Sequence, residues 1–288
     1  YDAAYWAQTF LSELRQKPDN ENQQTGVRTD PVTPAVMTAL TNAKEIAFFI
    51  DYDGTLREFE DLPHKASPTK EIMKVLSALT ELNACDVFII SGRKSADLEN
   101  WFRTLNVTLI AEHGCAIHKP SDREWRIINP NIDLSWKDKV IKIFSQYVST
   151  TPGTFVEEKM SSVVWHFRKA DPEFGKWKSQ QLSGNLLEIL ANENVVVNQG
   201  RLIVEVSSNQ ISKGTAVRHF MEKKDYDRVI CVGDDKTDEA MFKIDDPRII
   251  SIKIGPEDTF AKYRLSSPTL LRGFLAQLIK RKKRHHDG

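Results

Sequence analysis

The sequence predicts an α/β protein: a Rossmann-like parallel sheet with helices on both faces, plus an inserted α+β module whose antiparallel sheet carries helices on one face. Two observations predict this class. Short apolar runs alternate with amphipathic helical patterns before residue 117 and after residue 207, as is typical of parallel strands buried on both faces. Between these stretches the order changes to helices and hairpins. We therefore expect a core domain from residues 35–117 and 207–288, and an inserted domain from residues 118–206.

The first part of the chain should hold a separate helix, a linker and the first three core strands. Residues 1–16 are amphipathic, like the end helix of a preceding domain or a docking helix, and residues 17–34 are rich in Pro, Asn and Gln, like a linker. Strands are then expected at 46–50, 87–90 and 108–111, with helices at 69–82 and 94–105.

The insert and the second half of the core follow in the same way. We expect a hairpin after residue 118. It should be followed by a helix at 133–149, a hairpin at 154–168, a helix at 172–191 and a hairpin at 194–206. Ser212 can cap a helix that runs to about residue 224, and Ser267-Pro268 can start a last helix over 269–281. The core strands between these helices are expected at 229–232 and 249–254.

Composition and charge exclude several classes of protein. The 40 basic and 40 acidic residues of the 288 cancel, which removes the general electrostatic argument for binding nucleic acid. No apolar run approaches the length of a membrane span. The three cysteines form no disulfide framework or zinc pattern, which favours a reducing compartment such as the cytoplasm. We expect the basic run at 280–284 to be a solvated, disordered end.

Two carboxylates follow directly on the first buried strand. Asp51 and Asp53, with Gly54 and Thr55 after them, lie where an open parallel sheet binds its ligands, at the carboxyl end of a strand. One carboxylate can attack as a nucleophile while the other moves protons. An Asp-Gly pair is also common in surface turns, so this motif indicates a catalytic site only in combination with the clusters that follow.

Three further clusters lie at strand ends or helix starts. Ser91-Gly92-Arg93 offers a hydroxyl and backbone N–H groups to a phosphoryl oxygen, and Lys213 offers a charge; each pattern alone is ordinary. The run 233–239 places four acids within six residues, Asp234, Asp235, Asp238 and Glu239. Such a run suits Mg²⁺, although an acidic helix N-terminus would have the same composition.

Together the four clusters resemble the haloacid dehalogenase phosphatase superfamily, whose motifs occur in this order. The resemblance implies that Asp51 attacks phosphorus to form an aspartyl-phosphate, and that Asp53 protonates the leaving oxygen and then activates water. Ser91 and Lys213 would hold the phosphoryl oxygens. Mg²⁺ would be bound by Asp51, the carbonyl of Asp53 and Asp234, with Asp235 and Asp238 behind. We also expect Asp53 to lie among these carboxylates. The insert would be a cap that reads the leaving group; a receiver domain of signalling proteins has no such insert.

Alternation along the insert strands predicts a polar wall that faces the core. Val163, Trp165 and Phe167 should pack on the cap helices, as should Leu202, Val204 and Val206. The opposite face would carry Glu157, Lys159, His166, Arg168 and Glu205, with His166 the least decided. Such a wall can hydrogen-bond the hydroxyls of a sugar, although a solvated sheet face would look the same. His113 and His118 are interpreted as structural or surface residues.

The segments FFIDYDGTL, IISGR, LIAEHGCAI, VEEKMSSVVWHFR and VGDDKTDEAMF closely resemble trehalose-6-phosphate phosphatases. This resemblance implies trehalose 6-phosphate as substrate, gripped by Glu157, Lys159, Arg168 and Glu205, with Gly92 and Arg93 also near it. Residues 1–16 resemble the end of the preceding domain in fungal two-domain versions, which implies a trehalose synthase complex as partner. A phosphatase or phosphomutase for sucrose phosphate or a hexose phosphate, and a non-catalytic subunit that binds sugar phosphate, remain as alternatives.

Overall fold

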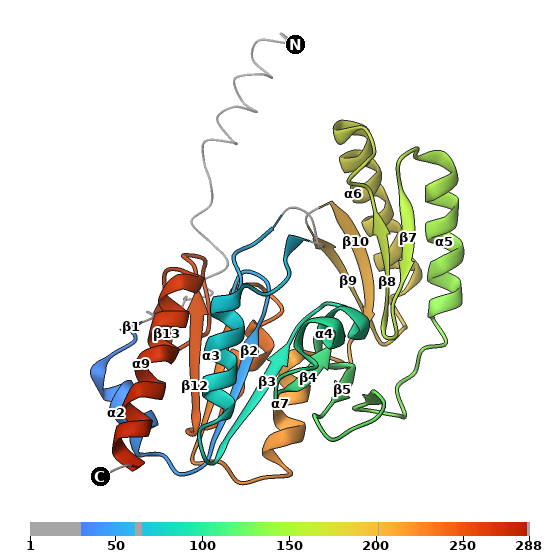
Figure 1. Ribbon diagram of the computed structural model, residues 1–288. Coiled ribbons are helices and arrows are strands. Elements are labelled where there is room, and N and C mark those ends of the chain that lie inside the picture. Colours follow the sequence, from blue (N-terminus) through green and yellow to red (C-terminus); the bar gives the residue numbers. More distant parts are fainter. Residues whose placement is uncertain (1–29, 61–64, 201, 287–288) are drawn as a thin grey trace, which may run out of the picture.

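The computed structural model describes residues 30–60, 65–200 and 202–286, which form two sheets with their helices (Figure 1). The predicted helix at 1–16 and residues 17–29 of the predicted linker lie outside the described residues. The rest of that segment is not a linker, because it contains β1 (Asp30–Pro31) and the first residue of α2 (Pro34–Asn42). Among the residues that the structure describes, no helix combines the length and the apolar character that a membrane crossing requires.

The larger sheet contains the predicted parallel strands in its centre. Its strands run in the order β1-β13-β12-β11-β2-β3-β4-β5-β6. All neighbours from β1 to β4 are parallel, whereas β5 and β6 are antiparallel to their neighbours. In this spatial order the strands are β1 (Asp30–Pro31), β13 (Tyr263–Leu265), β12 (Ile249–Ile254), β11 (Arg228–Gly233), β2 (Ile46–Asp51), β3 (Cys85–Ile90), β4 (Thr108–Ala111), β5 (Ala116–His118) and β6 (Arg126–Ile127).

Helices cover both faces of this sheet, which explains why its central strands β2 and β11 are mostly apolar and buried. In β2, Ile46, Phe48 and Ile50 pack on one side, and Ala47 and Phe49 pack on the other. The first side is covered by α2 (Pro34–Asn42), α3 (Lys70–Thr80), α4 (Ser95–Phe102) and α9 (Pro268–His286). The second side is covered by α7 (Lys213–Met221) and α8 (Glu239–Phe242).

The strand order reverses between β2 and β11, because β3 and β4 continue on one side and β12 and β13 on the other. The register pairs Val232 of β11 with Ile50 of β2, so both strands end at the same level of the sheet. Loops diverge at such a reversal and leave a crevice, the usual ligand site of open α/β sheets. The motif after β2 and the acidic run after β11 therefore meet at this point.

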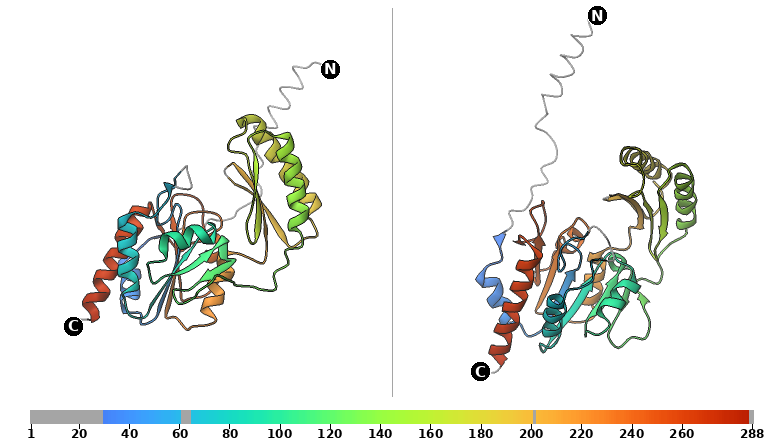
Figure 2. Two further views of the ribbon diagram at one scale, coloured as in Figure 1. Left: turned by 45° about the vertical axis from the view of Figure 1, so that its right-hand side comes forward. Right: turned by 45° about the horizontal axis from the view of Figure 1, so that its top comes forward.

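The smaller sheet forms a cap with helices on one face only. Its order is β7-β8-β10-β9 and every pair is antiparallel, as predicted. The strands are β7 (Phe155–Glu158), β8 (Ser162–His166), β9 (Val195–Gly200) and β10 (Ile203–Ser208). The helices α5 (Lys137–Thr150) and α6 (Pro172–Ile189) cover the face turned away from the core (Figure 2). Trp165, Phe167 and Val204 pack against these helices, which confirms the predicted apolar face.

Three expectations about the elements need correction. The hairpin placed at the start of the insert consists of β5 and β6 and extends the core sheet beside β4, so the core sheet continues to Ile127, past the expected boundary at residue 118. The basic run at 280–284 is helical in α9, where Lys282 is buried and donates to the carbonyl of Ala43 at 2.8 Å. The short elements α2, α8 and β13 were not predicted, because each lacks a periodic pattern long enough to detect.

Candidate active site

A buried ion-pair cluster lies at the carboxyl ends of β2 and β11. Asp51, the last residue of β2, is 4% exposed and accepts from Lys213 Nζ at 2.7 Å. Lys213 is the first residue of α7, whose start is fixed by Ser212 and Thr215 in a capping box. The same ammonium donates to Asp238 Oδ1 at 2.7 Å. Although burial works against the charge, Asp238 and Asp51 raise the pKa of Lys213 well above its usual value.

Asp238 holds the acidic loop that follows β11. Its Oδ2 accepts the backbone N–H groups of Asp234 and Asp235, both at 3.0 Å. Gly233 is required here, because a Cβ at this position would lie 2.0 Å from the carboxyl carbon of Asp238. Gly54 has a φ of 79°, and a Cβ there would meet the Asp234 carboxylate. The two glycines therefore allow the loops after β2 and β11 to approach each other closely.

The carboxylates form a group suited to a divalent cation. One oxygen from each of Asp51, Asp234 and Asp238 lies within 4.8 Å of the others. Burial raises the pKa of Asp51, an effect that Lys213 opposes and that Asp234 and Asp235 reinforce. Burial, Asp238 and Asp235 raise the pKa of Asp234. Carboxylates that repel one another in this way would be stabilised by a hard cation with oxygen ligands, and these residues therefore fit Mg²⁺.

Asp235 and Asp238 differ from Asp51 and Asp234 in the partners that they already have. Asp235 Oδ1 accepts from the backbone N–H and the hydroxyl of Thr237, at 2.8 and 2.6 Å. Despite its burial, Lys213 and Thr237 lower the pKa of Asp235. Both oxygens of Asp238 are occupied by Lys213 and the loop amides. These two residues are therefore placed to support the loop behind Asp234.

Asp53 lies in the loop after β2 and has a partner that the sequence did not indicate. Arg93 donates to both of its carboxylate oxygens, with Nε and Nη2 each at 2.7 Å. The guanidinium also lies over the ring of Trp101 at 4.6 Å. We expected Asp53 to lie among the other carboxylates. The structure instead pairs it with Arg93, and Asp53 does not belong to the group of carboxylate oxygens that lie within 4.8 Å of one another.

Ser91 and Gly92 form a tight turn at the end of β3. Ser91 is 2% exposed, and its hydroxyl oxygen accepts the backbone N–H of Arg93 at 3.2 Å. A Cβ on Gly92 would lie 2.4 Å from the Nε2 atom of His113, so the imidazole packs directly on the glycine backbone. Burial, followed by the charge of Lys213, lowers the pKa of His113 to about 4. The structure thus places this histidine beside the candidate site.

The cap sheet presents its predicted polar face to the core. The register places Glu157 of β7 and Glu205 of β10 on either side of Val164, all on one face. Glu205 is 8% exposed and accepts from the Ser162 hydroxyl at 2.7 Å and from Lys159 Nζ at 3.4 Å. His166 lies 2.8 Å from Glu157, and this contact lowers the pKa of Glu157 to about 2.

Two of these cap residues contact the core directly. Lys159 Nζ donates to the carbonyl of Gly92 at 3.4 Å, and Lys94 Nζ lies 2.7 Å from Glu157 Oε1. Arg168 follows β8 and is exposed. The wall is therefore brought next to the turn at Ser91 through Lys159 and Glu157.

Sequence reasoning missed two buried residues that support the acidic loop. Thr55 is fully buried, and its hydroxyl donates to Asp234 Oδ1 at 2.9 Å. Lys253 on β12 is 2% exposed and donates to the backbone carbonyl of Asp234. A lysine within an otherwise apolar strand, at the level where the neighbouring strand ends in acids, was the signal that could have identified it.

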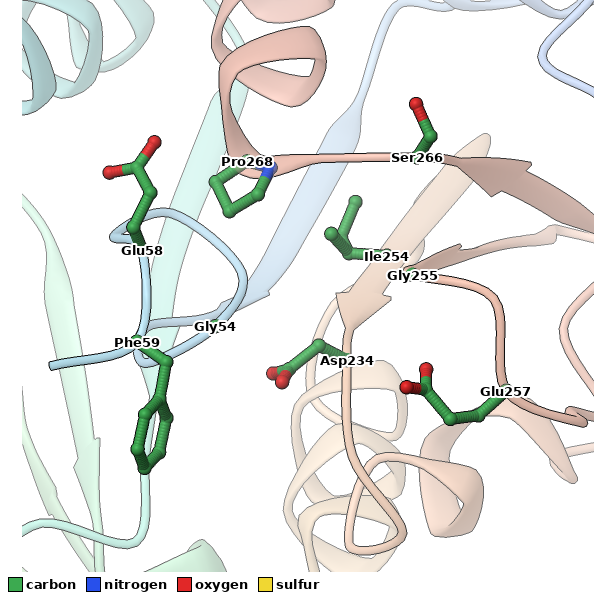
Figure 3. Close-up of a pocket in the computed structure, with 9 residues that line it drawn as sticks. All are labelled: Gly54, Glu58, Phe59, Asp234, Ile254, Gly255, Glu257, Ser266 and Pro268. Atoms are coloured by element: carbon green, nitrogen blue, oxygen red, sulfur yellow. The ribbon is translucent and has the colours of Figure 1, made fainter. Parts of the chain in front are cut away.

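A pocket of about 330 Å³ adjoins the acidic loop on the core. Figure 3 shows Asp234 at its centre, with Glu58 and Phe59 on one side and Glu257 on the other. Since Gly54 and Asp234 belong to both, the pocket is an extension of the same crevice.

The family model described as Trehalose-phosphatase matches residues 49–268. A protein named "Trehalose-phosphatase" from Schizosaccharomyces pombe is 37% identical over 70% of this chain and 24% of its own length. "Alpha,alpha-trehalose-phosphate synthase [UDP-forming] B" from Dictyostelium discoideum is 35% identical over 84% of this chain and 30% of its own length. The chain thus spans between 24% and 36% of the length of these curated relatives.

A solved structure agrees over nearly its whole length. The C-terminal domain of the trehalose-6-phosphate phosphatase of Candida albicans matches with a TM-score of 0.78 and 30% identity, over 88% of this chain and 99% of that one.

Proposed function

The chain belongs to the trehalose-phosphatase family, and from this premise we propose that it hydrolyses trehalose 6-phosphate to trehalose and phosphate, the last step of trehalose biosynthesis. The observation that carries the proposal is the buried Asp51–Lys213 pair, which lies at the strand-order reversal and beneath the polar wall of the cap. A nucleophile and a cation beneath a sugar-binding face are the components that this reaction needs.

In the proposed mechanism, a carboxylate oxygen of Asp51 attacks phosphorus and the bond from phosphorus to the sugar oxygen breaks. Asp53 gives a proton to that leaving oxygen, so trehalose departs and an aspartyl-phosphate remains. Asp53 then takes a proton from water, which attacks the phosphorus, releases phosphate and restores Asp51. Because Arg93 donates to both carboxylate oxygens of Asp53, the proposal requires Arg93 to release Asp53 and contact the substrate instead, so that Asp53 is free to give and take the proton.

The remaining residues of the core hold the phosphoryl group. Lys213 supplies a buried positive charge, and Ser91 supplies a hydroxyl next to the backbone of Gly92 and Arg93. For Mg²⁺, we propose Asp51, the backbone carbonyl of Asp53 and Asp234 as ligands, with Asp235 and Asp238 behind them. When bound, this ion would neutralise charge on the phosphoryl oxygens.

The cap would recognise the sugar. Glu157, Lys159, His166 and Glu205 offer acceptors and donors on one face, and Arg168 lies just beyond the end of β8, two residues after His166. A disaccharide presents hydroxyl groups on every side, and each hydroxyl can both donate and accept a hydrogen bond. A surface that carries both carboxylates and cations can therefore bind the hydroxyls on the side that faces it. The cap, taken as the insert beginning after β6, would then set the specificity of a generic phosphatase core.

A panel of phosphate esters tests the proposal. With Mg²⁺ present, we expect phosphate release from trehalose 6-phosphate to be at least about 100-fold faster, by kcat/KM, than from glucose 6-phosphate or sucrose 6-phosphate. The variant Asp51→Asn should lose at least about 10³-fold in kcat while keeping its melting temperature, because it lacks the nucleophile.

The alternatives predict different results. Comparable rates across the panel would favour a less specific sugar phosphatase, and transfer of phosphate back to a sugar would indicate a mutase. Binding of trehalose 6-phosphate without phosphate release would identify a non-catalytic subunit.

We further propose that the protein works in the cytoplasm with a trehalose-phosphate synthase, as the names of its longer relatives suggest. Cys85, Cys115 and Cys231 are free thiols, which supports a reducing compartment. A fungal source, which the sequence resemblance implies, stays a prediction, since matched relatives also come from Arabidopsis thaliana and Thermoproteus tenax.

A further inference from the structure

A strained turn lies where the core meets the cap. Glu112 and His113, between β4 and β5, have φ angles of 49° and 58°, a conformation that is unfavourable for residues with a Cβ. Glu112 is only 5% exposed, and His113 is half-buried. Consecutive strained residues persist only where surrounding contacts hold them, and they are common at functional sites. The strained turn is therefore expected to do more than connect β4 to β5.

Glu112 connects the core to the loop between β7 and β8 of the cap. Its Oε2 accepts the backbone N–H of Ser161 at 3.2 Å, and the backbone N–H of Met160 also stabilises the carboxylate. Ser161 is itself 3% exposed, so this contact is protected from water. Burial nevertheless raises the pKa of Glu112, because removing a carboxylate from water costs free energy. The hydrogen bonds to the cap loop offset this cost.

The loop that Glu112 holds carries Lys159. Lys159 contacts Gly92 of the core and Glu205 of the cap, both at 3.4 Å. On the other side of Glu112, His113 packs on the backbone of Gly92. The turn therefore fixes the distance between the phosphate-binding turn at Ser91 and the lysine of the sugar-binding wall.

The contact made by Glu112 also differs in kind from the neighbouring contacts between core and cap. The contacts Lys159–Gly92 and Lys94–Glu157 use wall side chains that would have to leave these partners in order to bind a sugar. Glu112 instead binds a backbone amide and uses no residue of the wall. It can hold the cap loop in place while Lys159 and Glu157 exchange partners.

We propose that Glu112 is a positioning residue for substrate specificity: its carboxylate anchors the cap loop at Ser161 and so places Lys159 over the phosphate-binding turn. The substrate named in this inference rests on the proposed function, whereas the contact between Glu112 and Ser161 is observed independently of it. Among the described residues, the Glu112 carboxylate bonds the cap loop and not the Asp51 cluster, so its loss should affect recognition of the sugar more than transfer of phosphate.

Amide hydrogen exchange and a pair of substrates test this role. In Glu112→Ala, the peptide spanning residues 159–165 should exchange faster than in the wild type, because the Ser161 amide loses its acceptor. The value of kcat/KM for trehalose 6-phosphate should fall about tenfold or more, since a small displacement of a binding group is costly, while that for p-nitrophenyl phosphate should change less than about threefold.

Three further variants separate positioning from simple destabilisation. Glu112→Asp keeps the charge but withdraws the carboxylate, and should show the same selective loss to a smaller extent. Glu112→Gln keeps an acceptor oxygen and should restore protection and selectivity. Glu81→Ala, an exposed glutamate on the core, should behave as the wild type.

Unchanged exchange in both Glu112→Ala and Glu112→Asp, or an equal loss on the two substrates, would overturn the proposal. If the wild type hydrolyses p-nitrophenyl phosphate but not trehalose 6-phosphate, the proposed function fails while the exchange data still decide whether Glu112 anchors the loop.

Discussion

Thr55 shows how a single hydroxyl orients the acidic cluster. The side chain is fully buried and donates to Asp234 Oδ1, while the other oxygen of that carboxylate stays available to a cation. Hydrogen bonds of this kind fix the direction of a metal ligand, and their loss typically costs about 10- to 100-fold in metal affinity. Thr55 should therefore act on Mg²⁺ through Asp234.

We predict that Thr55→Val weakens Mg²⁺ binding by about tenfold, because valine fills the same space but cannot donate to Asp234. Titration calorimetry of the phosphate-free protein with Mg²⁺ measures this directly. Thr55→Ser, which keeps the hydroxyl, should retain the wild-type affinity. An unchanged affinity in Thr55→Val would mean that Asp234 is oriented by other contacts, such as the Lys253 ammonium at its carbonyl.

At the scale of residues, the sequence predicted which functional side chains lie at strand ends, but it did not predict their hydrogen-bond partners. The carboxyl ends of parallel strands lie at one edge, which is why Asp51, Ser91 and Asp234 could be placed together without a structure. The pairing of Arg93 with Asp53 depends on how two loops bend after their strands. His113 was interpreted as structural because its burial against Gly92 depends on a strained turn that no local pattern reveals.

At the scale of elements, the alternation along the cap strands correctly separated the two faces of the cap sheet. Side-chain direction in a strand depends only on position, so Trp165 and Val204 could be assigned to the helices and Glu205 to the core side. The hairpin of β5 and β6 was assigned to the wrong sheet, since a short hairpin carries no signal about which strand it will join. The role of the polar face is a further question, which substitution of Glu205 addresses.

We predict that Glu205→Ala lowers kcat/KM for trehalose 6-phosphate by about 100-fold but changes that for p-nitrophenyl phosphate by less than about threefold. If Glu205 binds sugar hydroxyls as proposed, its removal leaves their hydrogen bonds unmade, whereas an aryl phosphate has no sugar hydroxyls to lose. Glu188→Ala, on the exposed side of α6, is the matched control and should leave both rates unchanged. A similar loss on both substrates would place Glu205 in the chemistry of the phosphoryl group instead.

At the scale of the whole molecule, the two sheets follow from the sequence but their meeting point does not. Strand periodicity distinguishes a parallel core from an antiparallel insert, and both were predicted. The contacts that join them come from loops and turns, among them Glu112 with Ser161 and Lys159 with Gly92. Such contacts depend on the path of the chain between elements, which periodicity does not describe.

His113 lies at this junction, and its burial links the stability of the protein to pH. Its imidazole interacts electrostatically with Lys213, Glu205, Lys159 and Asp235, and burial followed by the charge of Lys213 lowers its pKa to about 4. In the unfolded chain the pKa returns to about 6.5. Between these two values the unfolded state binds more protons, so the free energy of unfolding decreases as the pH falls from about 6.5 towards 4 and is fully retained above 6.5.

We predict that His113 alone accounts for about 2 kcal/mol of lost stability between pH 7.5 and pH 5.0, from the difference between the two pKa values. In His113→Asn, whose side chain does not titrate and whose backbone tolerates a positive φ, the decrease over this range should be smaller by that amount. Urea unfolding of both proteins at the two pH values gives the four free energies needed. Glu205 and Asp235 interact with His113, but the pKa of each is held below its usual value in the folded protein, so both stay ionised between pH 5.0 and 7.5 and the comparison reports on His113. If both proteins lose the same stability, His113 takes up its proton in the folded state as readily as in the unfolded chain, and its burial at the junction carries no electrostatic cost.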